Sequence, residues 1–264
     1  MRKYWLYFAG AFQIAFSYRA SLVIRMIRDF LMVLFFITLW RALFAGKETI
    51  AGFTFSGMVS YYILAKAVDQ LYTFDPGNVI ERHVRSGDLS NFLAKPINYM
   101  IYLASHIFGR RLARTILTII ASIVIIIVFP SFVGYPAGIF ETTAFFILIA
   151  LAWLLVFAFS YLIGMISFWT TEISNIRQGF ELLILILGGL WVPLNVLPDQ
   201  ISQILNYLPF KYLYYFPIQV YLGKVPVDKV FLGLITELCW ILGLLFIAKY
   251  LWQRGLKRFG AYGN

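Results

Sequence analysis

Charge is scarce in this sequence. Charged residues make up 13% of its 264 positions, while hydrophobic residues make up 61%. A soluble domain carries about 25% charged residues, because a globule in water needs polar groups on its outside. A bilayer instead solvates an apolar exterior with hydrocarbon. The composition therefore predicts an integral membrane protein and argues against a soluble enzyme.

Several chemical features are also missing. The sequence has one cysteine, Cys239, so a disulfide within the chain is excluded, and no Cys/His cluster has zinc spacing. No glycine loop ends in Lys-Ser or Lys-Thr, so the usual phosphate-binding loop of an ATPase is absent. No internal repeat is visible. We expect no catalytic residue, metal or cofactor in this chain.

Long apolar runs are abundant, and a helical span needs about 20 such residues. One run is rich in β-branched residues, but an open strand in lipid leaves its backbone unpaired, so a helix is expected there too. We predict one transmembrane domain over 1–264, with a six-span bundle over 21–252 and a cytoplasmic tail over 253–264. The predicted spans are 21–45, 52–73, 112–130, 143–169, 179–196 and 230–252.

The positions of Lys and Arg predict the orientation, because cytoplasmic loops carry an excess of them. Sixteen of the 22 fall in residues 1–29, 74–114, 170–178 and 249–264. Five fall in the alternate connections, and Lys66 lies within a span. Although a net charge of +10 in a soluble protein would suggest a nucleic-acid partner, these cations flank apolar runs. We expect a multi-pass protein of the cell membrane with both termini cytoplasmic and no nucleic-acid partner.

The first 20 residues are aromatic-rich but too polar for a span. On a helix, Lys3, Gly10, Gln13 and Ser17 share one narrow stripe, with most aromatics off it. That pattern predicts a helix lying in the cytoplasmic interface; the polar end of a longer first span is the alternative. No small-residue cleavage site follows, so we expect this segment to be retained.

Residues 193–229 are too apolar for an exposed loop, yet five prolines interrupt them. A seventh span here would place Lys249, Arg254, Lys257 and Arg258 outside, against the charge rule. Short helices on or dipping into the outer face fit better, with irregular backbone buried in protein or lining a wet cavity.

The connection between the second and third spans predicts a compact, charged cytoplasmic elbow. Residues 78–85 suit a short helix, Gly87 ends it, and Asp88 is placed to cap a second turn that runs to Lys95. Pro96 then stops the chain. The elbow is either a docking knob for a cytoplasmic partner or a solvated turn.

These features in this order resemble the permease subunits of ABC exporters of the ABC-2 type. RSGDLSNFLAKP is similar to that family's cytoplasmic loop, and LPFKYLYYFPIQVYLG to its outer segment. The subgroup it resembles most is the antibiotic- or daunorubicin-type exporter permease. The resemblance implies an all-α, type V exporter-like fold with six spans, an N-terminal interfacial helix, a cytoplasmic coupling helix and short re-entrant outer helices.

The resemblance also implies partners and sites, none of them catalytic. Two cytoplasmic ABC ATPase subunits would carry ATP and Mg, and a second permease, identical or homologous, would complete a dimer in membrane lipids. The ATPase-coupling loop would comprise Glu81, Arg82, Arg85, Gly87, Asp88, Leu89, Leu93 and Pro96. The outer gate would comprise Pro193, Pro198, Leu208, Pro209, Phe210, Pro217 and Gly223.

Three ionisable residues lie inside predicted spans, where each costs roughly 2.5–3.5 kcal/mol. Lys66 and Asp69 are three apart and able to pair on one helical face, either as a self-neutralising pair or along a permeation path. Glu237 has no obvious local partner and is either an interface or cavity group or a snorkelling acid. Gly188 and Gly189 in the fifth span are expected to allow close helix packing, with a hinge as the alternative.

The predicted function is export of a hydrophobic or amphipathic compound: a drug, an antibiotic, or a lipid-like or peptide molecule. A secondary transporter would need coupling-ion sites and usually repeated halves, and no repeat is present. A membrane-embedded enzyme would need clustered acids, histidines or a nucleophile. Co-purification with an ATPase would separate the first class from the other two.

Overall fold

The computed structural model describes residues 2–15, 19–72, 75–128, 136–170 and 172–261. Apart from an isolated bridge between Ile50 and Phe53, these residues form helices, turns and irregular segments. The α-helices are α1 (Arg2–Ala15), α2 (Arg19–Leu43), α3 (Phe55–Asp69), α4 (Asp75–Arg85), α5 (Leu89–Leu93), α6 (Tyr99–Val128), α7 (Ile139–Met165), α8 (Ser174–Leu187), α9 (Asp199–Tyr207), α10 (Tyr215–Tyr221) and α11 (Val227–Ala261). The 3₁₀ turns are η2 (Ile166–Phe168), η3 (Leu194–Val196) and η4 (Pro209–Tyr212).

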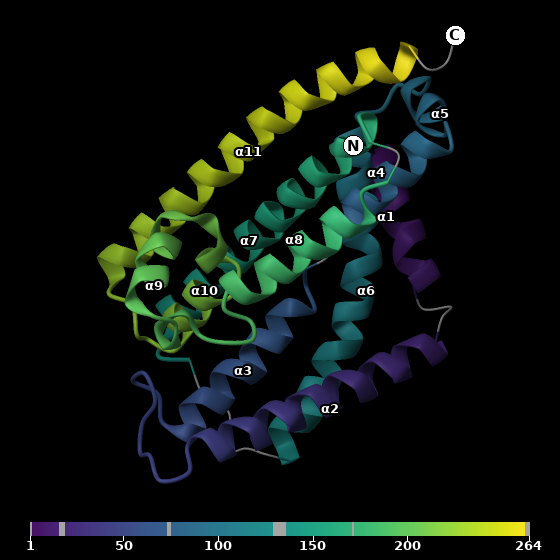
Figure 1. The fold of residues 1–264 in the computed structure, drawn as a ribbon. Helices are drawn as coiled ribbons and strands as arrows, with labels where there is room; N and C mark the ends of the chain where they lie inside the picture. The colour runs from purple at the N-terminus through teal and green to yellow at the C-terminus, as the bar shows by residue number, and fades with distance from the viewer. Residues whose placement is uncertain (1, 16–18, 73–74, 129–135, 171, 262–264) are drawn as a thin grey trace.

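Helix α7 is the centre of the bundle. Helices α4, α10 and α11 all pack against it, while α1 lies along α6 and α2 packs on α3 (Figure 1). Its residues Leu148, Ala152 and Leu155 are fully buried. A helix that is apolar on all sides is stable when its neighbours cover it, which explains why α7 takes the central position.

The molecule has two distinct ends. Helices α4 and α5 and the C-terminal end of α11 gather at one end, and α9, α10 and the α2–α3 connection gather at the other (Figure 1). The predicted cytoplasmic elements therefore share one end, and the predicted outer elements share the other. Which end faces the cytoplasm stays a prediction.

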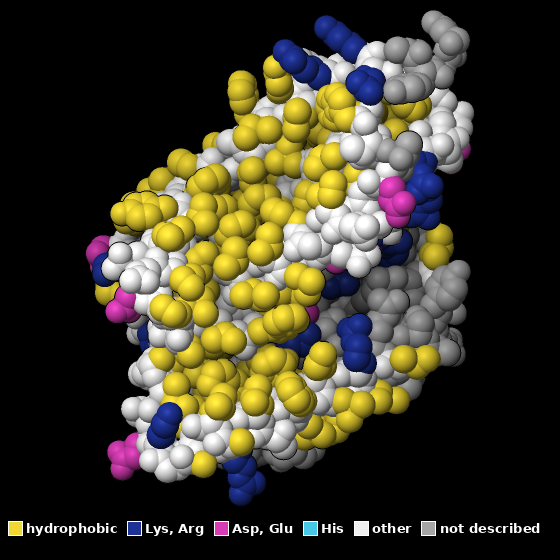
Figure 2. Space-filling model, viewed as in Figure 1, with side chains coloured by type: hydrophobic (Ala, Val, Ile, Leu, Met, Phe, Trp, Pro, Cys, Tyr) yellow, Lys and Arg dark blue, Asp and Glu magenta, His cyan; other side chains and the backbone are white. Residues whose placement is uncertain are grey.

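The exterior carries a broad apolar surface. Figure 2 shows hydrophobic side chains covering most of one face, with Lys and Arg at its edges and a few near its centre. Along α11, exposed large side chains include Phe231, Leu232, Ile235, Leu242 and Phe246. Soluble monomers rarely expose contiguous apolar patches of this kind, so this face is suited to lipid or to another membrane helix.

Two helical segments of the described residues are long and apolar enough to cross a membrane by length and composition. They are Ile139–Phe168 and Val227–Phe259. Both overlap predicted spans, and helices also occupy the other four predicted positions. The count of six spans stays a prediction.

The bounds of the predicted second and fifth spans were wrong. Helix α3 has 15 residues and α8 has 14, which makes each roughly 22 Å long, against a hydrocarbon core of about 30 Å. Helix α8 ends at Leu187 because Gly188 and Gly189 follow, and Gly189 has φ +90°. The two glycines thus end this helix and do not lie within it.

Two other helices extend further than the apolar runs predicted. Helix α6 begins at Tyr99, thirteen residues before the predicted span, and α11 continues to Ala261. The described part of the expected tail, 253–261, is therefore a continuation of α11. Both extensions carry cations, which a criterion based on apolarity alone excludes.

Helix α1 is a separate helix that packs on α6, with Ala11 buried and Trp5 exposed. Lys3 and Gln13 of the polar stripe are exposed, whereas Ser17 lies outside the described residues. Between 193 and 229, the prediction of short helical pieces is confirmed: η3, α9, η4 and α10 replace any continuous helix. The depth of both segments in a membrane stays a prediction.

Candidate functional site

The elbow is built from α4 and α5. Gly87 has φ +76°, a left-handed conformation that favours glycine, and it separates the two helices. Asp88 takes the N-cap position of α5, but its side chain makes no capping hydrogen bond and instead accepts one from Ser86 Oγ at 2.7 Å. The predicted capping role of Asp88 was wrong: its backbone has helical angles (φ −61°, ψ −19°), whereas a capping residue is typically extended.

Two glycines bring α4 against the central helix. A Cβ on Gly164 of α7 would lie 2.8 Å from the Cα of Gly77, and a Cβ on Gly77 would lie 2.9 Å from the Ser160 carbonyl. The backbone N–H of Gly77 also donates to Ser160 Oγ at 3.0 Å. This close approach couples the elbow mechanically to α7.

Glu81 differs from the expected partner-facing charge. Its side chain is buried, and its Oε1 accepts a hydrogen bond from the backbone N–H of Ile173 at 3.2 Å. The Arg85 guanidinium lies 3.8 Å from the same oxygen. Glu81 therefore ties α4 to the start of α8, a tertiary contact that the sequence does not reveal.

The remaining loop residues divide between packing and exposure. Leu89 is fully buried, which is also unlike a partner-facing residue, whereas Arg82 and Leu93 are exposed. Pro96 is exposed, and its carbonyl accepts a hydrogen bond from Lys3 Nζ of α1. The elbow is thus held from one side by α1 and from the other by α7.

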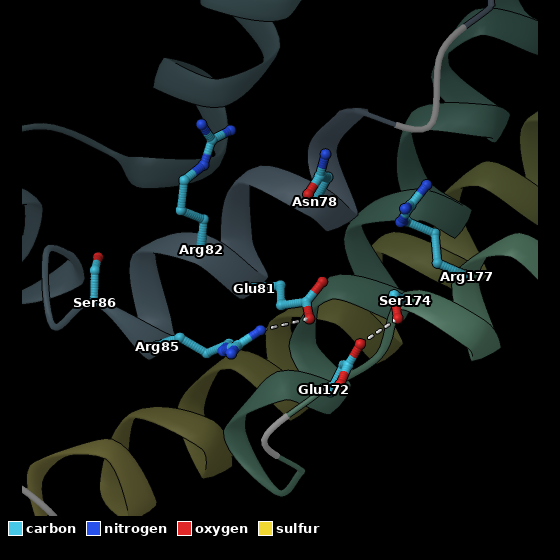
Figure 3. Close-up of a pocket in the computed structure, with 8 residues that line it drawn as sticks. All are labelled: Asn78, Glu81, Arg82, Arg85, Ser86, Glu172, Ser174 and Arg177. Carbon is cyan, nitrogen blue, oxygen red and sulfur yellow. Dashed lines mark hydrogen bonds and ion pairs between the residues drawn. The ribbon is translucent and has the colours of Figure 1, made fainter.

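A pocket of about 640 Å³ lies where α4 meets α8 (Figure 3). Arg82 and Arg177 reach from these two helices to either side of Asn78 (Figure 3). The lining residues are Asn78, Glu81, Arg82, Arg85, Ser86, Glu172, Ser174 and Arg177.

Most charges in this pocket are already paired. Glu81 holds Arg85, and Glu172 accepts a hydrogen bond from Ser174 Oγ at 2.7 Å. Arg177 forms an ion pair of 2.6 Å with Glu181. Arg82 has no ion pair with any other described residue. The geometry therefore presents an exposed cation at the mouth of the pocket, suited to an acidic group on a partner.

Aromatic side chains pack α4 against α5 and the start of α6. The His83 ring stacks on Phe92 at 4.7 Å, and its Nδ1 lies 2.7 Å from the Tyr99 hydroxyl. Burial lowers the pKa of His83, and the nearby Arg82 lowers it further. This packing gives His83 a structural role in the elbow.

The segment proposed as an outer gate is anchored to α3. The Tyr61 hydroxyl donates to the Gly189 carbonyl at 2.6 Å, and the Tyr72 hydroxyl donates to the Leu213 carbonyl at 2.7 Å. Phe210 stacks on Phe159 of α7 at 5.8 Å. These hydrogen bonds satisfy backbone groups in the broken segment, as apolar surroundings require.

The other residues of this segment lie along its turns. Pro193, Pro209 and Pro217 are buried, Leu208 is half-buried, and Pro198 and Gly223 are exposed. Gly223 has φ +68° and approaches Ala137 closely. They line one continuous folded segment, and their action as a gate stays a prediction.

The predicted pairing of Lys66 with Asp69 is confirmed. The two side chains lie 2.9 Å apart. Asp69 Oδ1 also accepts a hydrogen bond from the Tyr214 hydroxyl at 3.0 Å, and its carbonyl accepts one from Arg111 at 3.1 Å. Asp69 is thus a polar junction between α3, α6 and the outer segment.

Glu237 is fully buried in α11, so the snorkelling alternative was wrong. Neither carboxyl oxygen has a hydrogen-bond partner within the described part of the chain. Tyr72 and Tyr212 lie near this carboxyl group. The side chain therefore faces the interior of the bundle.

Sequence reasoning missed the contribution of α8 to the elbow. Glu172, Ser174 and Arg177 were considered only as part of a short connection with one cation. The ion pair of 2.7 Å between Asp75 and Arg110, which joins α4 to α6, was also missed. Charged residues placed just before an apolar run were the available signal for both.

An all-helical bundle with an apolar exterior and charged residues at its ends is typical of a membrane protein. Over residues 30–263 the sequence matches the family described as ABC-2 family transporter protein. The chain belongs to this family, and it is accordingly a membrane permease of the kind that works with an ABC ATPase. Among curated proteins, none matches the chain.

Proposed function

We propose that this chain is the membrane-spanning subunit of an ATP-driven exporter that moves a hydrophobic or amphipathic compound out of the cytoplasm. Two copies, or this chain and a homologous permease, form a dimer with six spans each and both termini in the cytoplasm. ATP and Mg bind to separate ATPase subunits. Closure of those subunits rocks the two bundles and opens a route between them toward the outside.

The observation that carries this proposal is the elbow. It combines an exposed Arg82, a pocket shared with α8, and a glycine contact with α7. An ATPase surface with a matched acidic group would dock here, and its motion would pass through Gly77 and Gly164 into the centre of the bundle. The anchored outer segment at the other end supports a gate there.

Arg82→Glu tests the docking site more cleanly than a change at Arg85, because Arg85 neighbours the buried Glu81. Reversing a charge against a matched surface costs several kcal/mol, and each 1.4 kcal/mol weakens binding about tenfold. We expect the variant to fold and insert but to lose the ATPase and transport. Lys47→Glu, an equal charge reversal in the exposed α2–α3 connection, is the matched control.

The measurement is the amount of ABC ATPase, by mass spectrometry, that co-purifies with the tagged chain in mild detergent from its native membrane, together with ATP hydrolysis. The wild-type and Lys47→Glu chains should retain both, and the chain alone should neither bind nor hydrolyse ATP. An Arg82→Glu chain that keeps its ATPase and its transport would show that the elbow is only a turn and does not dock the ATPase.

A further inference from the structure

A second charged pocket lies at the same end of the molecule and shares no lining residue with the elbow pocket. It has a volume of about 490 Å³ and is lined by Trp169, Arg254, Lys257 and Arg258. We name it the Trp169 pocket. One wall follows the end of α7 and η2, and the other is the last part of α11.

Close packing fixes the two walls against each other. A Cβ on Gly255 of α11 would overlap the Phe168 ring, so glycine is what allows that ring to seat on the helix. Phe168 also makes edge-to-face contacts with Trp252 and Phe259, at 5.8 and 6.3 Å between ring centroids. Trp169 follows directly in the chain, so its position beside the α11 cations is set by this packing.

The lining of the pocket is basic, with no acidic side chain among its four residues. Arg254 and Lys257 are three residues apart and so share one helical face, where like charges repel, and Arg258 also lines the pocket. The Arg254 guanidinium lies 4.8 Å from the centre of the Tyr250 ring. Within the described chain, no carboxylate forms an ion pair with Arg254 or Lys257. An anion in this pocket would relieve the repulsion.

The position of the pocket along the candidate spans also bears on its ligand. The segments Ile139–Phe168 and Val227–Phe259 both qualify as spans, and the pocket is at the end of each. The second has 33 residues, or roughly 50 Å of helix, which exceeds a hydrocarbon core of about 30 Å. A helix of this length extends past the hydrocarbon, and the cations at its C-terminal end suit the headgroup region, where tryptophan is enriched. Trp169 is 39% exposed.

We propose that the Trp169 pocket binds the phosphate of an anionic phospholipid headgroup. Arg254, Lys257 and Arg258 donate hydrogen bonds to the phosphate oxygens, and Trp169 packs against the glycerol region. The site is lined by other residues than the elbow pocket, and it depends on the chain's place in a membrane and not on ATPase docking. Its occupant would fix the depth of α11 and of the end of α7 in the bilayer.

The test uses the full chain in nanodiscs of phosphatidylcholine that contain a minor fraction of phosphatidylglycerol. Spin-labelled phosphatidylglycerol and phosphatidylcholine report the relative affinity for each lipid. The variant is Arg254→Gln with Lys257→Gln and Arg258→Gln. The control, Arg41→Gln with Lys47→Gln and Lys229→Gln, removes three exposed cations from elsewhere and changes the net charge equally.

Each cation near an anionic surface contributes about fivefold in affinity. We therefore expect the pocket variant to lose more than about tenfold of its preference for phosphatidylglycerol. The control should keep the preference of the wild type. Should the triple variant fail to fold, Lys257→Gln alone should still lower the preference, since Lys257 is exposed and makes no ion pair within the described chain.

An equal preference for phosphatidylglycerol in the pocket variant and in the control would overturn the proposal. So would full displacement of phosphatidylglycerol by millimolar inorganic phosphate, which would assign the pocket to a soluble anion. Loss of the ATPase from the pocket variant with an unchanged lipid preference would assign it to a protein partner and also overturn the proposal. A failure of Arg82→Glu to release the ATPase would leave this lipid site unaffected.

Discussion

A fully buried carboxyl group without a hydrogen-bond partner is unusual, since buried polar groups are nearly always satisfied. Glu237 is in this position among the described residues, with Tyr72 and Tyr212 close by. An ionised carboxylate here would lack any compensation, and an uncompensated buried charge costs several kcal/mol. The physical expectation is that a neutral group of the same shape is tolerated and a permanent charge is not.

We therefore predict that Glu237→Gln folds with an unchanged or higher Tm. Glu237→Arg should lower stability by several kcal/mol, because it places a longer group that stays charged in the same space. Thermal unfolding of the purified variants in detergent measures both effects. A large fall in Tm for Glu237→Gln would contradict this reasoning and would mean that a bound cation compensates the carboxylate.

His83 makes the stability of the elbow depend on pH. Burial lowers the pKa of His83 in the folded elbow. His83 therefore binds a proton at a higher pH when the elbow is locally unfolded than when it is folded. Above the usual histidine pKa of about 6.5, His83 is neutral in both the folded and the unfolded elbow, so stability does not change with pH. Below that pKa the unfolded elbow gains the proton first, and the stability of the folded elbow falls. We expect hydrogen-exchange protection of α4 and α5 to decrease from neutral to mildly acidic pH, more than that of α11. His83→Gln should reduce this dependence, and an unchanged pH profile would count against the assignment.

At the scale of whole elements, the contact between α4 and α7 depends on the absence of a side chain. A Cβ on Gly164 would lie 2.8 Å from both Gly77 Cα and Ile80 Cδ1, and one of these contacts is backbone. A Cβ on Gly243 of α11 would meet nothing within 4 Å. The two glycines therefore form a matched pair, one constrained by packing and one free.

Gly243→Ala should stabilise the protein by up to about 1 kcal/mol, since alanine favours a helix over glycine by that amount. Gly164→Ala should instead destabilise it by about 1–3 kcal/mol through overpacking. Thermal unfolding of the two variants checks the difference in sign. If both substitutions raised the Tm, α4 would not approach α7 as closely as described.

The sequence predicted elements well where one signal dominated. Uninterrupted apolar runs identified α7 and α11, and prolines identified the broken segment that holds η3, α9, η4 and α10. The predicted ends of helices were wrong where an apolar run continued through residues that favour a turn. The apolar run after Leu187 continues through Gly188 and Gly189, but the backbone turns there, because the φ of Gly189 is accessible mainly to glycine.

The elbow shows what sequence does not reveal. Its existence, its charge and the break at Gly87 were predictable from local residue types. The burial of Glu81 and Leu89 was not, because it depends on contacts with Ile173 and with other aromatic and aliphatic side chains far along the chain. A charged residue that satisfies a distant backbone N–H looks the same in sequence as one that faces a partner.

For the whole molecule, the distribution of cations predicts one orientation in the membrane. Sixteen of the 22 Lys and Arg residues fall in the segments expected in the cytoplasm, and positively charged loops are retained on that side. The elbow and the C-terminal end of α11 also share one end of the fold (Figure 1). Reversing the chain would require those cations to be transported across the bilayer.

Single cysteines in a Cys239→Ala background test this orientation, with a membrane-impermeant maleimide as the label. Ser90→Cys and Gln253→Cys should react only in inside-out vesicles, whereas Glu48→Cys and Ile139→Cys should react only in intact cells. All four positions are exposed, so a lack of reaction reports the membrane and not burial in the protein. Reaction of Gln253→Cys in intact cells, together with reaction of Ser90→Cys only in vesicles, would place the elbow and the end of α11 on opposite sides. Because the fold brings these two ends together, that result would contradict both the six-span topology and the packing of α11 on α7.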